Sequence, residues 1–291
     1  MPRDPKFAEL AAEEYVQKLG IKKLPIDPID IAENDLKILV TPKPASSKGV
    51  SGMLLRVGNE FGISYATHIK SDGFQRFSVA HEIGHYKLPD HIDHVLPPGQ
   101  NIHESKASFV SNDPYEREAD HFAAGLLMPD PLFSEEMIRV GDGLDAIESL
   151  STTCRTSLEA TAIRYVERAK IPAAVLRSKG QIIEYCKMSD SLRHLDGIEW
   201  IRKGTVVPAG TMTDILNSDP YKVATSKRID STTYLSDWFG SEWPIELNEE
   251  VKGLGQYGKT LTILSAPEGI DLEEIREEME LDDSLEARFK R

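Results

Sequence analysis

Two histidines and a glutamate stand together in the segment His81-Glu82-Ile83-Gly84-His85. On a helix, side chains four residues apart project from one face, so both imidazoles can bind the same metal ion. The glutamate after the first histidine lies beside that face, where it can accept a proton from a water molecule without being a ligand. The spacing therefore predicts a hydrolytic zinc centre, with His81 and His85 as ligands and Glu82 as the catalytic base.

A catalytic zinc ion needs a third protein ligand, so that its fourth position stays open for water. Glu116 and Asp120 share one face of a predicted helix. We expect Glu116 to bind the metal and Asp120 to accept a hydrogen bond from a ligand histidine, which fixes the tautomer of that ring. Two alternatives remain for the third ligand. Glu118 points about 200° away on the helix, and His91 has the metzincin spacing but follows Leu88 where that motif has glycine.

The elements that carry these residues are predicted from periodicity and from residues that end helices. A helix is expected from about Phe74 to Lys87, ended by Pro89, and another from Pro114 to Leu127. Residues 90–113 show no sustained period and are expected to form a long irregular loop. The strands 53–57 and 61–66 flank Gly58-Asn59-Glu60, which predicts a β-hairpin.

The rest of the chain predicts an α+β protein with two domains. A helix is expected over 7–18, a strand over 36–40, and a helix-turn-helix-like (HTH-like) pair over 146–170 with a break near Thr152. Short strands are expected over 173–176, 181–186, 205–207, 221–224 and 260–264. The expected divisions are a peptidase domain at 1–135, a helical segment at 136–170, an α+β domain at 171–267 and an acidic tail at 268–291, either helical or disordered.

Composition limits the environment and the partners. The chain has 291 residues and a net charge of −14, which disfavours direct binding of nucleic acid or anionic membranes. It has neither a signal-peptide pattern nor a run of apolar residues long enough to span a bilayer, so we expect a cytoplasmic protein. Cys154 and Cys186 are too few for a disulfide framework and are expected to be reduced thiols.

Three segments, in this order and spacing, resemble the ImmA/IrrE family of zinc metallopeptidases. They are Leu24-Pro25-Ile26-Asp27-Pro28, then residues 76–85 (RFSVAHEIGH), then residues 116–129 (EREADHFAAGLLMP). The resemblance covers about residues 7–170 and implies a zincin-like fold in which the edge strand of a small sheet binds the substrate backbone. On that analogy, the hairpin over 53–66 is the expected edge. The second domain resembles the GAF-like sensor domain of the IrrE branch.

The resemblance also implies an activity. Members of the family typically cleave an HTH transcriptional repressor at one site, which derepresses stress-response genes, DNA-damage genes among them, or mobile-element genes. The resemblance implies a site-specific endopeptidase that uses Zn²⁺, or Mn²⁺ in its place, and that acts on a protein partner. Two other functions stay open. One is a zinc hydrolase of small peptides or amides, and the other is a binding module that keeps the fold and sequesters its partner.

Overall fold

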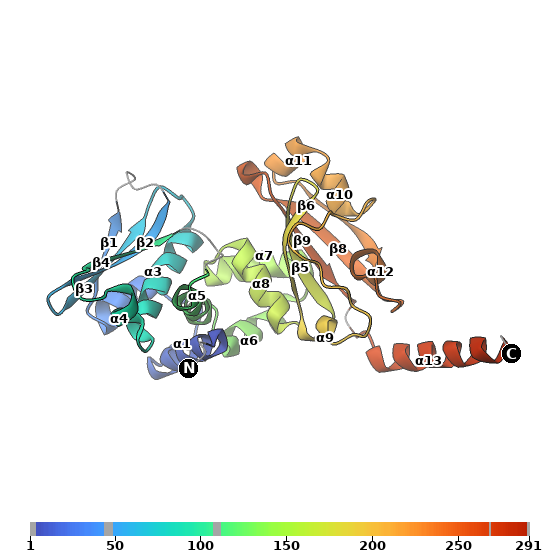
Figure 1. Cartoon of the computed structure of the whole chain (residues 1–291), viewed down its shortest axis with the longest axis horizontal. Coiled ribbons are helices and arrows are strands. Elements are labelled where there is room, and N and C mark those ends of the chain that lie inside the picture. Colours follow the sequence, from blue (N-terminus) through green and yellow to red (C-terminus); the bar gives the residue numbers. More distant parts are fainter. Residues whose placement is uncertain (1–3, 44–48, 107–111, 268, 290–291) are drawn as a thin grey trace. The chain divides into compact units, whose positions relative to one another are not determined.

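The chain folds into two compact units, residues 1–161 and 162–291. The computed structural model describes residues 4–43, 49–106, 112–267 and 269–289 (Figure 1). Each unit contains one β-sheet with associated helices, so the expected α+β class is confirmed.

The sheet of the first unit has four strands in the order β1-β3-β2-β4. Strand β1 (Leu39–Lys43) runs parallel to β3 (Glu60–Ala66), and β2 (Val50–Val57) runs antiparallel to both β3 and β4 (Ile102–Lys106). The predicted hairpin is confirmed as β2 and β3. Its expected place at the edge is wrong, because β1 and β4 form the edges of the sheet in the described part of the chain.

Helix α3 (Asp72–Lys87) packs against this sheet, and two further helices of the unit, α5 (Pro114–Leu127) and α1 (Pro5–Lys18), pack in turn on α3 and on α5. Helix α3 packs against β2, β3 and α5, and α5 also packs against α1. The contact between α3 and α5 is close at Gly84, where a Cβ atom would lie 3.2 Å from the Ala119 Cα atom. The interior is apolar and holds Leu54, Ile63, Val79, Ile83, Phe122 and Leu126.

Local signals explain where α3 and α5 begin and end. The Ser71 side chain accepts a hydrogen bond from the backbone N–H of Phe74, and the Asp113 side chain caps α5 in the same way. Pro114 occupies the first turn of α5, where the missing N–H costs nothing. Helix α3 ends at Leu88, which has extended backbone geometry because Pro89 follows it.

The expectation of an irregular loop over residues 90–113 is wrong in its described part. The segment contains a short helix, α4 (His91–Val95), and the edge strand β4. His91, at the start of α4, is fully buried. A single turn of helix and an edge strand of mixed polarity are too short to show a hydrophobic period, so the sequence pattern did not reveal them.

The remaining helices of the first unit are short. They are α2 (Pro28–Asp30), a π-helical turn (Ile31–Asp35), α6 (Asp130–Val140) and α7 (Gly143–Cys154). Helix α8 (Leu158–Arg168) runs across the division of the chain at residue 161. The predicted break between α7 and α8 lies at Arg155, whose backbone has φ of +54°.

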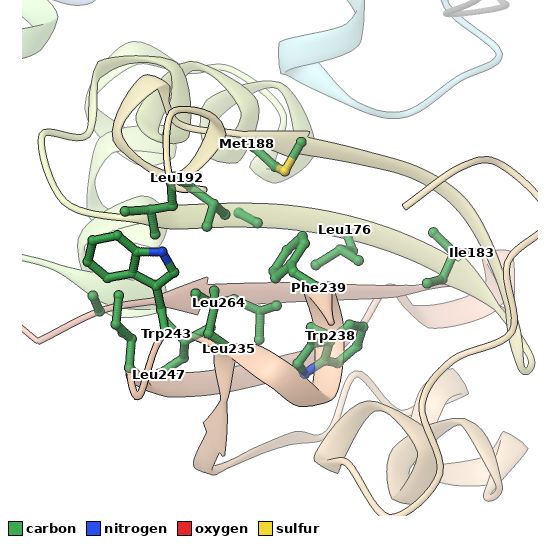
Figure 2. Close-up of a cluster of buried hydrophobic side chains, with 14 of the residues drawn as sticks. Leu176, Ile183, Met188, Leu192, Leu235, Trp238, Phe239, Trp243, Leu247 and Leu264 are labelled. Atoms are coloured by element: carbon green, nitrogen blue, oxygen red, sulfur yellow. The ribbon is translucent and has the colours of Figure 1, made fainter. Parts of the chain in front are cut away.

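The second unit contains a five-stranded antiparallel sheet in the order β6-β5-β9-β8-β7. Its strands are β5 (Ala173–Lys179), β6 (Ile182–Met188), β7 (Arg228–Tyr234), β8 (Glu246–Gly253) and β9 (Thr260–Ser265). The described helices are α9 (Asp190–Arg193), α10 (Met212–Asn217), α11 (Pro220–Ala224) and α12 (Leu235–Phe239), followed by α13 (Leu272–Phe289) in the tail. Aromatic and aliphatic side chains, Trp238, Phe239 and Trp243 among them, form its core (Figure 2).

Two expectations for this unit fail. Residues 221–224 form helix α11 rather than a strand, because Asp219 caps the backbone N–H groups of Tyr221 and Lys222. Around 205–207 there is only an isolated bridge between Val206 and Ile182. Within the described residues, the helices are all too short or too polar to cross a membrane.

Candidate metal centre

His81, His85 and Glu116 converge between α3 and α5. One potential ligand atom from each residue lies within 4.8 Å of the others. The Nε2 atoms of His81 and His85 are 3.0 Å apart. Glu116 faces both rings, with carboxylate oxygens 3.3 Å from the Nε2 atom of His81 and 3.4 Å from that of His85. The helical spacing and the approach of α5 thus bring together the three residues that the sequence singled out.

Burial and mutual contact change the acidity of this group. Burial favours the neutral ring of His81, but hydrogen bonds with Asp120 and Glu116 outweigh burial and raise its pKa to about 10. Burial lowers the pKa of His85 to about 3. Burial alone would raise the pKa of Glu116, but hydrogen bonds with His103, His81 and His85 hold it well below its usual range. Glu116 is therefore a carboxylate that faces buried imidazoles.

Asp120 lies behind His81, one helical turn after Glu116. Its Oδ1 atom is 2.9 Å from the Nδ1 atom of His81. A carboxylate at this position keeps a proton on Nδ1, so that Nε2, which faces Glu116 and His85, is the nitrogen that can bind a metal once it has lost its own proton. This is the arrangement expected for Asp120 from the sequence.

His91 and Glu118, the alternatives for the third ligand, lie outside the convergent group. The Nδ1 atom of His91 is 3.1 Å from the Nδ1 atom of His85, on the side of that ring opposite its Nε2 atom. The Nε2 atom of His91 is 2.9 Å from a carboxylate oxygen of Glu118. Both residues are buried. The structure therefore places them behind His85 rather than beside Glu116.

Glu82 is fully buried next to this group. Neither of its carboxylate oxygens has a hydrogen-bond partner at bonding distance among the described residues. Burial raises its pKa. Strand β2 approaches it closely, because a Cβ atom on Gly52 would lie 2.5 Å from the Glu82 Oε1 atom. Gly52 is a site residue that the sequence reading missed, although a glycine inside a strand signals the close approach of another group.

His103, on the edge strand β4, also reaches the group. Its Nε2 atom is 3.0 Å from the Oε1 atom of Glu116, and its ring centroid is 4.9 Å from that of His85. The sequence reading did not select His103 among the histidines between residues 81 and 121. The pairing of β4 with β2 brings His103 to the site. Hydrophobic periodicity does not predict such a long-range contact.

This arrangement fits a metal ion of the catalytic zinc type. Two imidazoles and one carboxylate are the donor set of zinc hydrolase sites that keep a fourth position for water. Two ring nitrogens that face each other at 3.0 Å are suited to share a cation. The oxygens of Glu82, buried without a protein partner, are suited to accept a hydrogen bond from a water molecule in the site.

Comparison with known proteins agrees with the motifs. Residues 33–165 match the model of a peptidase family described as the IrrE N-terminal-like domain. The chain contains an IrrE N-terminal-like domain. The resemblance recognised from the sequence is therefore confirmed. The IrrE N-terminal-like domain includes α3, β4 and α5, which carry the convergent residues and His103. The match of this domain to a peptidase family indicates a regulatory or protease-like function.

A solved structure of a Mycobacterium tuberculosis transcriptional regulator is similar in fold. The similarity has a TM-score of 0.56 at 15% sequence identity and covers 89% of this chain and 76% of that one. At that identity the likeness shows a shared fold and carries no information about activity. The search of curated proteins returned no significant match.

Proposed function

We propose that the protein is a zinc-dependent endopeptidase that cleaves an HTH transcriptional repressor at one site. The observation that carries the proposal is the grouping of His81, His85 and Glu116 around one point beside the unpartnered, buried Glu82. Burial of a carboxylate without a hydrogen-bond partner costs free energy, and a catalytic role is one reason for a fold to keep such a group. The IrrE N-terminal-like domain supports the peptidase class.

In this proposal His81, His85 and Glu116 hold the metal, and Asp120 keeps the His81 ring in its binding tautomer. Zinc, or manganese in its place, would polarise the scissile carbonyl and make water more acidic. Glu82 accepts the proton of the attacking water and passes it to the leaving amine. Burial raises the pKa of Glu82, which makes its carboxylate a stronger proton acceptor than an exposed one.

The partner is proposed from charge and from the family. With a net charge of −14, the chain favours a basic partner, and DNA-binding repressors are commonly basic. Cleavage of such a repressor would derepress stress-response genes, DNA-damage genes among them, or mobile-element genes. A repressor substrate places the reaction in the cytoplasm.

The zincin-like class of the first unit and the GAF-like sensor role of the second are also proposals. A four-stranded sheet beside the helix that carries the histidines supports the first. A five-stranded antiparallel sheet with a closed apolar core and associated short helices supports the second. The functional divisions at residues 135, 170 and 267 stay predictions.

The proposal is tested by incubating the purified, zinc-loaded chain with HTH regulators from its own genome and analysing the products by mass spectrometry. One regulator should be cut at a single position, and a chelator should prevent the cut. Cleavage of short peptides without any protein partner would favour the small-peptide hydrolase instead. Stable binding of a regulator that stays intact would favour the sequestering module.

A further inference from the structure

Two buried side chains that the proposed reaction does not use lie on the Nδ1 side of the His85 ring. Its outer ring nitrogen, Nδ1, faces the Nδ1 atom of His91 at 3.1 Å. The other nitrogen of His91 faces the Oε2 atom of Glu118 at 2.9 Å. His85 and His91 have no exposed surface, and Glu118 is 4% exposed. These three residues form a buried chain of hydrogen bonds, here named the His85 relay.

The proton positions in the His85 relay follow from the need for one donor and one acceptor in each hydrogen bond. A neutral imidazole has one N–H and one lone pair. An ionised carboxylate can only accept, so opposite Glu118 in that form the Nε2 atom of His91 carries the proton. The Nδ1 atom of His91 is then an acceptor, and the Nδ1 atom of His85 must be the donor. With a metal in place of the hydrogen bond between His85 and Glu116, the lone pair of His85 is consequently on Nε2, the atom that faces His81 and Glu116.

The opposite arrangement of protons is unfavourable at both ends. If the Nδ1 atom of His91 donated to His85, the proton of His85 would be on Nε2, where it would block a metal. The Nε2 lone pair of His91 would also face the Glu118 carboxylate at 2.9 Å, so two buried acceptors would repel each other. Glu118 thus selects the tautomer of His85 that can bind a metal, with His91 as the intermediate.

Contacts between α4 and α5 hold His91 in place. The ring of His94 stacks on Tyr115 at 3.6 Å between centroids with an interplanar angle of 5°, and its Nε2 atom is 3.1 Å from the Oδ2 atom of Asp113. The rings of Tyr115 and His91 then meet edge to face, with 5.0 Å between their centroids. Helix α4 is therefore fixed on the start of α5, and a rigid supporting shell of this kind improves the precision of a binding site.

The two ligand histidines reach carboxylates of the same helix by different routes. His81 donates directly to Asp120, whereas His85 reaches Glu118 through an intervening ring. Glu118 points away from Glu116 on α5, and His91 spans that distance. We propose that His91 and Glu118 are positioning residues that hold His85 in its metal-binding tautomer. This inference rests on the proposed metal centre.

The test compares zinc affinity, measured by competition with a chelator, in the wild-type chain, His91→Leu and His91→Asn. Leucine fills similar volume without an acceptor, whereas the asparagine oxygen lies near the position of Nδ1 and can accept from His85. Loss of such a supporting group costs about 10- to 100-fold in metal affinity. We expect that loss in His91→Leu and recovery of most of it in His91→Asn.

Two further measurements separate positioning from a merely structural role. Unfolding of the metal-free variants in urea reports the packing cost, which should be similar for leucine and asparagine. Glu118→Gln keeps a hydrogen-bond acceptor and should therefore bind zinc more tightly than Glu118→Leu. If His91→Leu does not fold, these two Glu118 variants replace the two His91 variants in the test. Wild-type affinity in His91→Leu, or equally weak affinity in both members of each pair, would overturn the inference. A wild-type chain that binds no zinc would refute the metal centre, and the relay with it.

Discussion

His81 and His85 are one helical turn apart, yet the two rings have different surroundings. His81 contacts the carboxylate of Asp120 and has a raised pKa, whereas His85 is enclosed by another imidazole and has a lowered one. The protein environment, rather than the spacing, makes the two ligands different. Glu116 faces both rings and is the residue whose role is most directly testable.

Replacing Glu116 with alanine should remove most of the bound zinc. Loss of a residue that only supports a ligand lowers metal affinity about 10- to 100-fold. Loss of a ligand itself should therefore lower it more than about 100-fold. Elemental analysis and chelator competition measure the effect. Glu104→Ala is the matched control, because Glu104 is a half-exposed carboxylate on β4 that pairs with Lys43. Full zinc occupancy in Glu116→Ala would exclude Glu116 as a ligand.

Residues that share a helix face could be predicted from the sequence, and residues joined by tertiary contacts could not. The pairs His81–His85 and Glu116–Asp120 follow from helical periodicity alone. His91 and Glu118 are 27 residues apart and meet only because α4 packs on α5. Both are candidate metal ligands from the sequence, because the sequence shows that they are suitable donors but not on which side of His85 they lie.

At the scale of elements, the site depends on how closely β2 approaches α3. A Cβ atom on Gly52 would lie 2.5 Å from the Oε1 atom of Glu82, so a side chain there must displace the carboxylate. On the other side, Gly84 allows helix α5 to pack closely on α3, because a Cβ atom on Gly84 would lie 3.2 Å from the Ala119 Cα atom. Two glycines thus set the spacing of the layers around the site.

Gly52→Ala should therefore reduce cleavage while leaving zinc binding largely intact. A displacement of about 1 Å in a catalytic group can cost about 100-fold in rate, and the three atoms nearest to a Cβ atom on Gly52 all belong to Glu82 rather than to a ligand. Gly62→Ala on β3 is the matched control, because its Cβ atom would meet only ordinary contacts, the nearest at 3.7 Å. The rate of cleavage and the zinc content are measured for both. Unchanged cleavage by Gly52→Ala would contradict the proposed position of Glu82.

The helices α3 and α5 were predictable because capping residues and prolines mark their ends. Strand β8 was not predictable from the sequence, although buried residues alternate with more exposed ones along it. The reason is Glu249, which is buried at an inward-facing position and accepts hydrogen bonds from the backbone N–H and the hydroxyl of Thr213. A charged residue there conceals the apolar period that a sequence reading relies on.

At the scale of the whole molecule, the metal centre belongs to the first of the two units. His81, Glu82, His85 and Glu116 all lie within residues 1–161. All three tryptophans, Trp200, Trp238 and Trp243, lie in the second unit. Tryptophan fluorescence therefore reports the second unit, and circular dichroism reports both.

Removal of the metal should destabilise the first unit selectively. Zinc present at about 1,000 times its Kd contributes about 4 kcal/mol, which corresponds to roughly 10 °C in the Tm of a domain of this size. A chelator should lower the first thermal transition seen by circular dichroism and leave the transition seen by fluorescence in place. Added zinc should restore the original curve. An equal shift of both signals would contradict a stabilisation confined to the first unit.

The central claim is that the buried Glu82 is the base of a zinc hydrolase site. The most direct measurement is cleavage of the protein substrate by Glu82→Gln at matched zinc content. Glutamine keeps the shape of the side chain and cannot accept the proton, so removal of such a base should slow cleavage at least about 100-fold. We expect that loss together with full zinc occupancy and full partner binding. Cleavage at the wild-type rate by the zinc-loaded Glu82→Gln chain would contradict it.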